Sequence, residues 1–143
     1  MKYLLNVWLA LAVASAACTS SDHLSGPSLG DGGTTTVPAS TETFNGTVPV
    51  GGSDIHTFNA LAGPLTVTLN SAGPPTTIVM GVGVGVPNGS ACTIFNGGSV
   101  NTAAGASAQL TGSINSPGPL CVQVSDIGNQ TGAVSYRVTV IHS

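Results

Sequence analysis

The sequence contains very few charged residues. Of its 143 residues only two are lysine or arginine and five are aspartate or glutamate, which gives a formal net charge of −3. The two bases are Lys2 and Arg137. Nucleic-acid binding needs several basic side chains on phosphates, and attachment to anionic lipid needs a basic cluster. Both functions are therefore excluded, and no nucleic-acid partner is expected.

Long hydrophobic runs are also scarce, and the one that is present lies at the start of the chain. A basic residue, Lys2, precedes the apolar stretch 4–14, and the small residues 15–17 follow it. This stretch is too short for a transmembrane helix and has the three-part layout of a secretory signal. We therefore predict a signal peptide over residues 1–17 and export of the chain.

Cysteine is rare as well. Of the three cysteines, Cys18 lies near the start of the chain, and Cys92 and Cys121 lie in its second half. Small residues followed by Cys18 resemble the bacterial lipobox, in which the cysteine becomes the acylated N-terminus of the mature protein. Ser15 stands where that motif usually has leucine. Lipid on Cys18 would leave Cys92 and Cys121 as one pair, and an oxidising compartment favours their disulfide.

The predicted location follows from this cysteine. We expect the lipid on Cys18 to anchor the chain to a membrane, which is then its first partner. Thr19 is not the aspartate associated with inner-membrane retention in some bacteria. By that resemblance the expected location is the cell envelope, at the outer membrane or cell surface. Cleavage after Ala16 or Ala17 and secretion as a soluble protein is the alternative.

Residues 18–42 are rich in serine, threonine and glycine and have too few apolar residues for any periodicity. Such a segment cannot bury enough surface to offset its ordering entropy, so we predict a flexible linker. From residue 43 to 143 apolar and polar residues alternate in short runs separated by glycine- and proline-rich turns. The runs are 44–48, 54–58, 65–69, 77–86, 91–95, 106–114, 120–124 and 134–140. About eight short strands at this spacing predict an all-β fold, an antiparallel β-sandwich or jelly roll.

The run 77–86 has the most regular pattern. Its apolar residues, from Ile78 to Val86, share one parity, while Gly81, Gly83 and Gly85 share the other. One face of this strand is therefore expected in the core. The glycine face offers bare backbone that another strand, a loop or a partner can approach closely, which makes it a possible interaction face.

The order of the strands resembles the bacterial pre-peptidase C-terminal (PPC-like) domain family over residues 44–141. The resemblance rests on the segments 54–58, 63–69, 118–124 and 135–140 and on the strand at Ile78. It implies a β-sandwich attached to secreted enzymes or surface proteins. His56 stands where an aromatic is usual, and the aromatic expected near Leu120 is absent. Some relatives bind calcium or collagen, but no matching acidic cluster or aromatic surface occurs here.

Catalytic chemistry has few candidates. Asp54 and His56 share a strand face and could orient a catalytic imidazole, as in a small hydrolase, or hold a metal; the simpler interpretation is a turn residue and a packed strand residue. Asp126 begins a turn. Paired carboxylates for glycoside hydrolysis would have to come from these aspartates and Glu42. We therefore expect no catalytic residue, no metal site, no cofactor and no enzyme.

The sequence predicts a non-catalytic envelope lipoprotein whose β-sandwich serves surface interaction or structure. Its partner would be an envelope protein or a glycan. The alternative is a glycan- or calcium-binding accessory module of a secreted system. Exposed aromatics would support glycan binding, but of Phe44, Phe58, Phe95 and Tyr136, strand parity turns at least Phe58 and Tyr136 inward.

Overall fold

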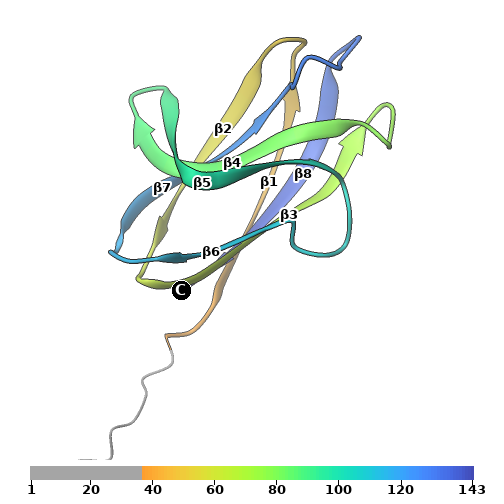
Figure 1. The fold of residues 1–143 in the computed structure, drawn as a ribbon. Helices are drawn as coiled ribbons and strands as arrows, with labels where there is room; N and C mark the ends of the chain where they lie inside the picture. Colours follow the sequence, from red (N-terminus) through yellow and green to blue (C-terminus); the bar gives the residue numbers. More distant parts are fainter. Residues whose placement is uncertain (1–36) are drawn as a thin grey trace, which may run out of the picture. The chain divides into compact units, whose positions relative to one another are not determined.

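The computed structural model describes residues 37–143, which form eight strands (Figure 1). Their bounds are β1 Ser40–Val48, β2 Ser53–Ala60, β3 Gly63–Gly73, β4 Val79–Asn88, β5 Ala91–Ala103, β6 Leu110–Ile114, β7 Gly118–Ser125 and β8 Val134–His142. Within this range the fold has no helix, and none that could cross a bilayer. The predicted signal peptide and Cys18 lie outside the described residues.

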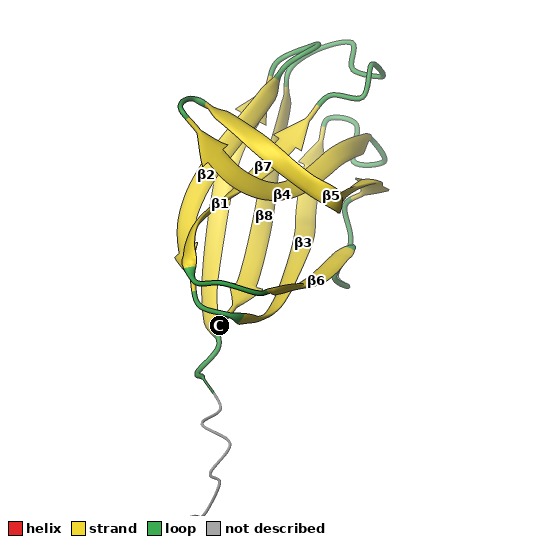
Figure 2. Cartoon of the chain, turned by 60° about the vertical axis from the view of Figure 1, so that its left-hand side comes forward, coloured by secondary structure: helices red, strands yellow, loops and turns green. Residues whose placement is uncertain are grey.

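The strands form two four-stranded sheets with the orders β1-β8-β3-β6 and β2-β7-β4-β5. All ladders are antiparallel, and the pairs are nested: β1 with β8, β2 with β7, β3 with β6 and β4 with β5. This nesting is the jelly-roll arrangement of a double sheet. In Figure 2, β1, β8 and β3 run alongside one another, and the strands of the second sheet cross over them. The predicted all-β sandwich is confirmed.

The core lies between the two sheets and follows directly from alternation along each strand. In β8, for example, the inward residues are at most 3% exposed from Val134 to Val140, while Ser135 and Arg137 point outward. The core consists almost entirely of aliphatic side chains, and each buried valine or leucine contributes about 1.5–3 kcal/mol. Its largest fully buried members are Leu69, Met80, Val48, Val67, Val82, Val84, Val122, Val124, Val134, Val138 and Val140.

The strand at 77–86 confirms the parity prediction except at its end. Met80, Val82 and Val84 are no more than 2% exposed, whereas Val86 is 41% exposed. Placing Val86 in the core is therefore wrong. At this point the residue of core parity faces the open space of a pocket that Pro87 and Phe95 also line.

The run after 91–95 also differs from expectation. The sequence predicts a turn at Asn96-Gly97-Gly98, but β5 continues to Ala103. The register against β4 jumps there, because Gly83 pairs with Ser99 and Gly85 with Ile94. Val84 alone in β4 thus lies opposite four residues of β5, and residues 95–98 bulge out of the ladder. We call this segment the β5 bulge.

At Gly83 and Gly85, part of the glycine face of β4 is covered by the chain itself. A Cβ on Gly85 would collide with the main-chain oxygen of Thr93, and one on Gly83 would lie 2.8 Å from the Ile94 side chain. The first part of β5 therefore lies directly against the bare backbone of β4. These glycines are needed for internal packing.

The predicted disulfide between Cys92 and Cys121 is present. It joins β5 to β7, although β4 lies between these two strands in the sheet. The two Cα atoms are 5.9 Å apart, and the close approach of β5 to Gly85 makes that distance possible. The disulfide therefore holds the β4–β5 hairpin against the sheet.

The strand β1 begins at Ser40, three residues before the start of the predicted domain. Residues 40–42 pair with residues 140–142 of β8, with Ser40 opposite His142. Part of the predicted linker thus belongs to the sheet.

Candidate functional site

A sandwich of two sheets has two long openings, one at each pair of edge strands. Here β1 and β2 border one opening, and β5 and β6 border the other. We call these the β1–β2 seam and the β5–β6 seam. Asp54 and His56, the candidate catalytic pair, lie in the β1–β2 seam. The β5–β6 seam contains a large groove.

The β1–β2 seam is closed by a polar cluster that contains Asp54 and His56. The Tyr136 hydroxyl donates a hydrogen bond to Oδ2 of Asp54 at 2.8 Å and lies 2.8 Å from Nε2 of His56. The imidazole also stacks on Phe44, with ring centroids 4.7 Å apart and planes 10° from parallel. The three groups come from β2 and β8, and Phe44 comes from β1, so the cluster ties both sheets together.

The hydrogen-bond pattern fixes the hydrogen on the imidazole. Since the single hydroxyl hydrogen of Tyr136 goes to Asp54, Nε2 of His56 must donate to the hydroxyl oxygen. Burial, together with the hydrogen bond and the negative charge of Asp54, raises the pKa of Tyr136. The hydroxyl therefore keeps its proton at all ordinary pH values.

In this arrangement Nε2 of His56 donates to Tyr136 and cannot act as a general base, and Nδ1 is the ring nitrogen that carries the free lone pair. Within residues 37–143 no group of three or more His, Cys, Asp or Glu residues could hold a metal. The pair Asp54 and His56 is thus brought together as the sequence suggested, with Tyr136 as a third member that strand spacing alone did not identify.

A second polar pair closes the far end of the same seam. Nε2 of His142 lies 3.1 Å from Oε1 of Glu42, and its Nδ1 lies 2.9 Å from the main-chain oxygen of Ser143. The His142 ring is 3% exposed and packs on Phe58 with centroids 5.1 Å apart. Side chains therefore fill the β1–β2 seam along its length.

Asp126 has the turn role that the sequence predicts. Its Oδ1 accepts hydrogen bonds from the main-chain nitrogens of Gly128, Asn129 and Gln130. Its Oδ2 accepts one from Gly51 at 2.7 Å, which joins the β1–β2 turn to the β7–β8 loop. The hydrogen bond from Gly51 is the main cause that lowers the pKa of Asp126, so the carboxylate is the form that stabilises the turn.

The β5–β6 seam, in contrast, holds a groove of about 780 Å³. Its walls come from the start of β3, the end of β4, the β5 bulge, β6 and the β6–β7 turn. The side chains that line it are mainly aliphatic, with a few hydroxyls and amides and, among the described residues, no charge. The apolar members are Leu65, Val84, Val86, Pro87, Phe95, Leu110, Ile114, Pro117, Pro119 and Leu120, and the polar ones are Asn96, Thr111, Ser113, Asn115 and Ser116.

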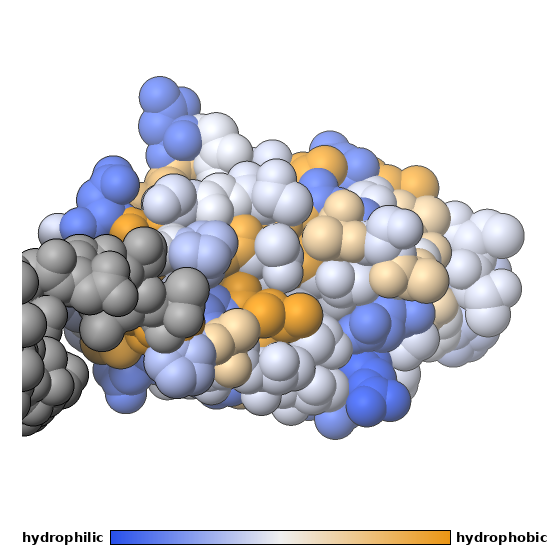
Figure 3. Space-filling model, turned by 90° about the horizontal axis from the view of Figure 1, so that it is seen from below, coloured by the Kyte–Doolittle hydropathy of each residue, from blue (hydrophilic) through white to orange (hydrophobic). Residues whose placement is uncertain are grey.

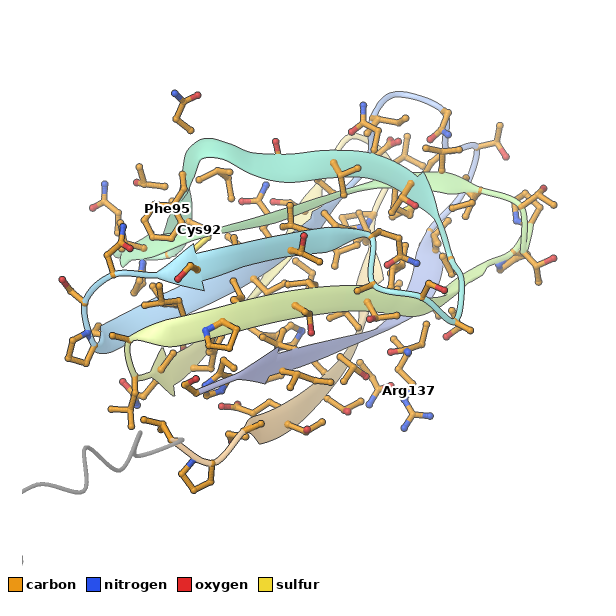
Figure 4. All side chains as sticks on the ribbon, turned by 60° about the horizontal axis from the view of Figure 1, so that its bottom comes forward. Cys92, Phe95 and Arg137 are labelled. Carbon is orange, nitrogen blue, oxygen red and sulfur yellow. A yellow bond between two sulfur atoms is a disulfide. The ribbon has the colours of Figure 1, made fainter. Side chains whose placement is uncertain are left out.

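The β5 bulge supplies an exposed aromatic side chain to the groove. Phe95 is 45% exposed, although it is one of few aromatics in the domain. Figure 4 shows Phe95 beside Cys92 at one end of the molecule, and Arg137 well away from it and pointing outward. The surface seen from below carries hydrophobic residues between weakly polar ones (Figure 3).

Glycine keeps the groove open at β6. The partner of Gly112 in the ladder is Leu65, which is buried, so Gly112 presents its Cα to the inner side of the sheet. A Cβ built on Gly112 would meet nothing within 4 Å. Unlike Gly83 and Gly85, Gly112 is therefore not required by packing, and the space in front of it belongs to the groove.

The predicted interaction face of β4 forms a smaller hollow of about 180 Å³ on the outer side of the second sheet. Gly81 and Gly83 line its floor, with Ile94, Asn101 and Ser125 around it. Gly85 lies under β5 and outside this hollow. Whether a partner binds this face stays a prediction.

The groove could not be predicted from the sequence. Its residues come from four separate segments between 65 and 120, and each segment by itself has ordinary turn or strand chemistry. One local signal was available: Phe95, an aromatic directly before Asn96-Gly97-Gly98. Strand parity by itself did not place this side chain.

Comparisons with known proteins identify no family. No family model matches the chain, and no curated protein matches it. Among solved structures the chain is similar to PliG of Aeromonas hydrophila, a periplasmic lysozyme inhibitor of g-type lysozyme. The two are 18% identical, the match covers 73% of this chain and 86% of that one, and the TM-score is 0.45. A likeness at this level assigns no function, and the PPC-like resemblance stays a prediction.

Proposed function

We propose that this chain is a non-catalytic interaction module of the cell envelope, and that it binds an uncharged ligand in the groove of the β5–β6 seam. The observation that carries this proposal is the groove itself. It is large, mainly apolar and uncharged along its described lining, and glycine holds it open where packing does not demand glycine.

Size and chemistry both support a binding role. Ligand sites in proteins are typically concave, about 300–1,000 Å³ in volume and mostly apolar, with a few polar groups that fix orientation. The groove has this volume and this mixture of aliphatic, hydroxyl and amide groups. A charged ligand would lose hydration without gaining a partner there, so the ligand is expected to be neutral.

The location within the proposal rests on the first segment of the chain. The signal sequence and Cys18 support export and a lipid anchor, with the outer membrane or cell surface as the site and soluble secretion as the alternative. Mass spectrometry of the mature protein tests this point. Acyl mass on Cys18 supports the anchor, and an unmodified Cys18 in the culture medium contradicts it.

A glycan-binding accessory module is the second candidate. Phe95 offers an exposed ring face, and Asn96 and Asn115 offer amide groups nearby in the same groove, which suits a neutral sugar. Calcium binding receives no comparable support, because residues 37–143 hold no group of three or more His, Cys, Asp or Glu residues that could hold a metal.

The groove can be tested with Nile red, a neutral apolar dye. Gly112→Leu places a side chain in the groove, whereas Gly132→Leu adds the same side chain at another glycine that meets nothing within 4 Å and does not line the groove. We expect dye binding to the wild type and to Gly132→Leu, and at least tenfold weaker binding to Gly112→Leu.

Two results would overturn the proposal. Equal dye binding by both variants would show that the groove is not a binding site. Hydrolysis of ester or glycoside substrates that disappears in His56→Ala would show that the module is catalytic, with its chemistry in the β1–β2 seam.

A further inference from the structure

We propose that the occupant of the groove is an extended, uncharged polypeptide segment of a partner protein, which adds to the free edge of β6 as a new strand. This inference rests on the proposed function, because it requires the groove to be a binding site. It specifies which backbone groups would hold the segment and which side chains would receive it.

Alternate residues of β3 direct their backbone groups toward β6. The main-chain oxygen of Val67 accepts a hydrogen bond from the nitrogen of Gln109, just before β6, at 3.0 Å. The oxygen of Leu69 likewise accepts one from Gly105 at 2.9 Å. Odd-numbered residues in this part of β3 therefore direct their N–H and C=O groups toward β6. Successive residues of a strand alternate in direction, so the even-numbered ones face β8.

The register of the β3–β6 ladder then fixes the direction of the backbone groups in β6. Its residues Leu110, Gly112 and Ile114 pair with odd-numbered residues of β3 and hence direct their backbone groups toward β3. Thr111 and Ser113, which lie between them, direct theirs the other way. They pair with Thr66 and Pro64, and Pro64 has no N–H to offer.

No described strand pairs with this second edge, because β6 is the last strand in its sheet. Thr111 and Ser113 are both exposed. The edge therefore offers two N–H donors and two C=O acceptors in the spacing of a strand ladder, which is the requirement for strand addition.

The groove lies where the side chains of an added strand would point. Residues paired with Thr111 or Ser113 would turn outward, and their neighbours would turn inward beside Gly112. That inward space is empty in front of Gly112 and is bordered by Phe95 and Leu110. Since the described lining carries no charge, the inward residues of the segment should be small and apolar.

The other edge strands lack this combination. The inner sides of β1 and β2 are filled by the aromatic and polar cluster around Phe44, His56 and Tyr136. The edge of β5 is interrupted by its bulge at residues 95–98. Only at β6, among the described strands, do a free regular edge and an open apolar groove meet.

The test uses capped seven-residue peptides of alternating valine and threonine, with binding followed by NMR titration of the folded domain. Two further peptides carry N-methyl groups on alternate residues, one at odd and one at even positions. N-methylation removes backbone donors along one edge of the strand. We expect shifts at Thr111 to Ser113 and at Phe95, and at least tenfold weaker binding for one methylated peptide and not the other.

Variants of the protein separate backbone pairing from side-chain contact. Ser113→Pro removes an N–H that faces the free edge and leaves the β3–β6 ladder intact, whereas Ser113→Ala keeps it. Gly112→Leu fills the groove, with Gly132→Leu as its control. Ser113→Pro and Gly112→Leu should each weaken peptide binding at least tenfold, and the two controls should bind as the wild type does.

The outcomes distinguish this inference from the proposed function. If both methylated peptides bind equally, or none of the peptides binds while Nile red does, strand addition is wrong and the groove remains a binding site. Titration with chitohexaose that is blocked by Gly112→Leu, without peptide binding, would identify a neutral glycan as the occupant instead. If sedimentation experiments show a dimer and Gly112→Leu abolishes it, the occupant is a second copy of this chain. That result would also contradict a segment of a partner protein as the occupant.

Discussion

The two seams of this sandwich are built from equivalent parts and have opposite properties. Each lies between the edge strands of two four-stranded sheets. In the β1–β2 seam, aromatic and hydrogen-bonded side chains such as His56 and Tyr136 bridge the sheets. In the β5–β6 seam, a bulge and a glycine leave a groove of about 780 Å³.

The difference shows that the same residue type can close a seam or open it. Gly46, in the closed seam, has the Asp54 carboxylate and the Tyr136 hydroxyl packed against its Cα. Gly112, in the open seam, has nothing in front of it. A glycine in a strand therefore does not by itself show whether other atoms pack against its Cα. The residues across the seam decide that.

The largest effect on stability is expected from loss of the disulfide that joins β5, at the open seam, to β7. Replacing Cys92 or Cys121 by serine opens a crosslink that spans 29 positions and should lower stability by about 3.5 kcal/mol on the chain-entropy model. Thermal unfolding of the single and double variants measures this. The double variant should resemble either single one, because each removes the same bond. A clearly additive loss would show that the cysteines act separately.

In the closed seam, Gly46→Ala should cost about 1–3 kcal/mol, because its methyl group would collide with the Asp54 carboxylate and crowd the Tyr136 hydroxyl. Denaturant unfolding gives the change. Gly132→Ala is the matched control, since a Cβ there meets nothing within 4 Å. Equal stability of both variants would mean that the seam relaxes freely, and the contrast between the seams would lose its basis.

Alkaline pH should weaken the closed seam through Tyr136. The folded protein raises the pKa of this hydroxyl, so an unfolded tyrosine ionises first. Its contribution is therefore complete below about pH 10, the ordinary tyrosine pKa, and is lost as the pH rises above it. Melting temperatures measured from pH 8 to 11 should fall at the alkaline end for the wild type.

Tyr136→Phe is the control for that measurement. It should be destabilised by about 1–3 kcal/mol at neutral pH, because Asp54 and His56 lose their shared partner. It should also lose the part of the alkaline decline that comes from this hydroxyl. An unchanged alkaline decline in the variant would assign the effect to other groups.

The smallest effect on stability is expected in the open seam. Gly112→Leu fills empty space and replaces glycine in a strand interior, so its stability should equal that of the wild type or exceed it by up to about 1 kcal/mol. Unfolding experiments beside Gly46→Ala test this directly. A loss of more than about 1 kcal/mol would mean that the groove is needed for folding rather than for binding.

The fold was largely predictable because alternation is a local property. Each of the eight expected runs overlaps a strand, and parity placed Val82 and Val84 in the core. The disulfide followed from counting cysteines, and it is present. The errors lie where tertiary geometry overrides a local pattern: Val86 faces the open groove, and Asn96-Gly97-Gly98 forms a bulge instead of a turn.

The candidate site was less predictable for a physical reason. A groove is the space that side chains from distant segments do not fill, and no single segment carries that information. Asp54 and His56 attracted attention because their chemistry is visible in a sequence, yet they form part of a closed seam. Gly112 carries no chemistry and leaves the space that a ligand would need.

The nested strand order has a consequence for biosynthesis. Ser40 at the start of β1 pairs with His142 at the end of β8, so the first strand has no partner until the last one has been delivered. Such distant pairings make folding slow, on the order of milliseconds to seconds. A chain that crosses a membrane unfolded would gain from this delay, because its first sheet cannot close while the final strand is still in transit.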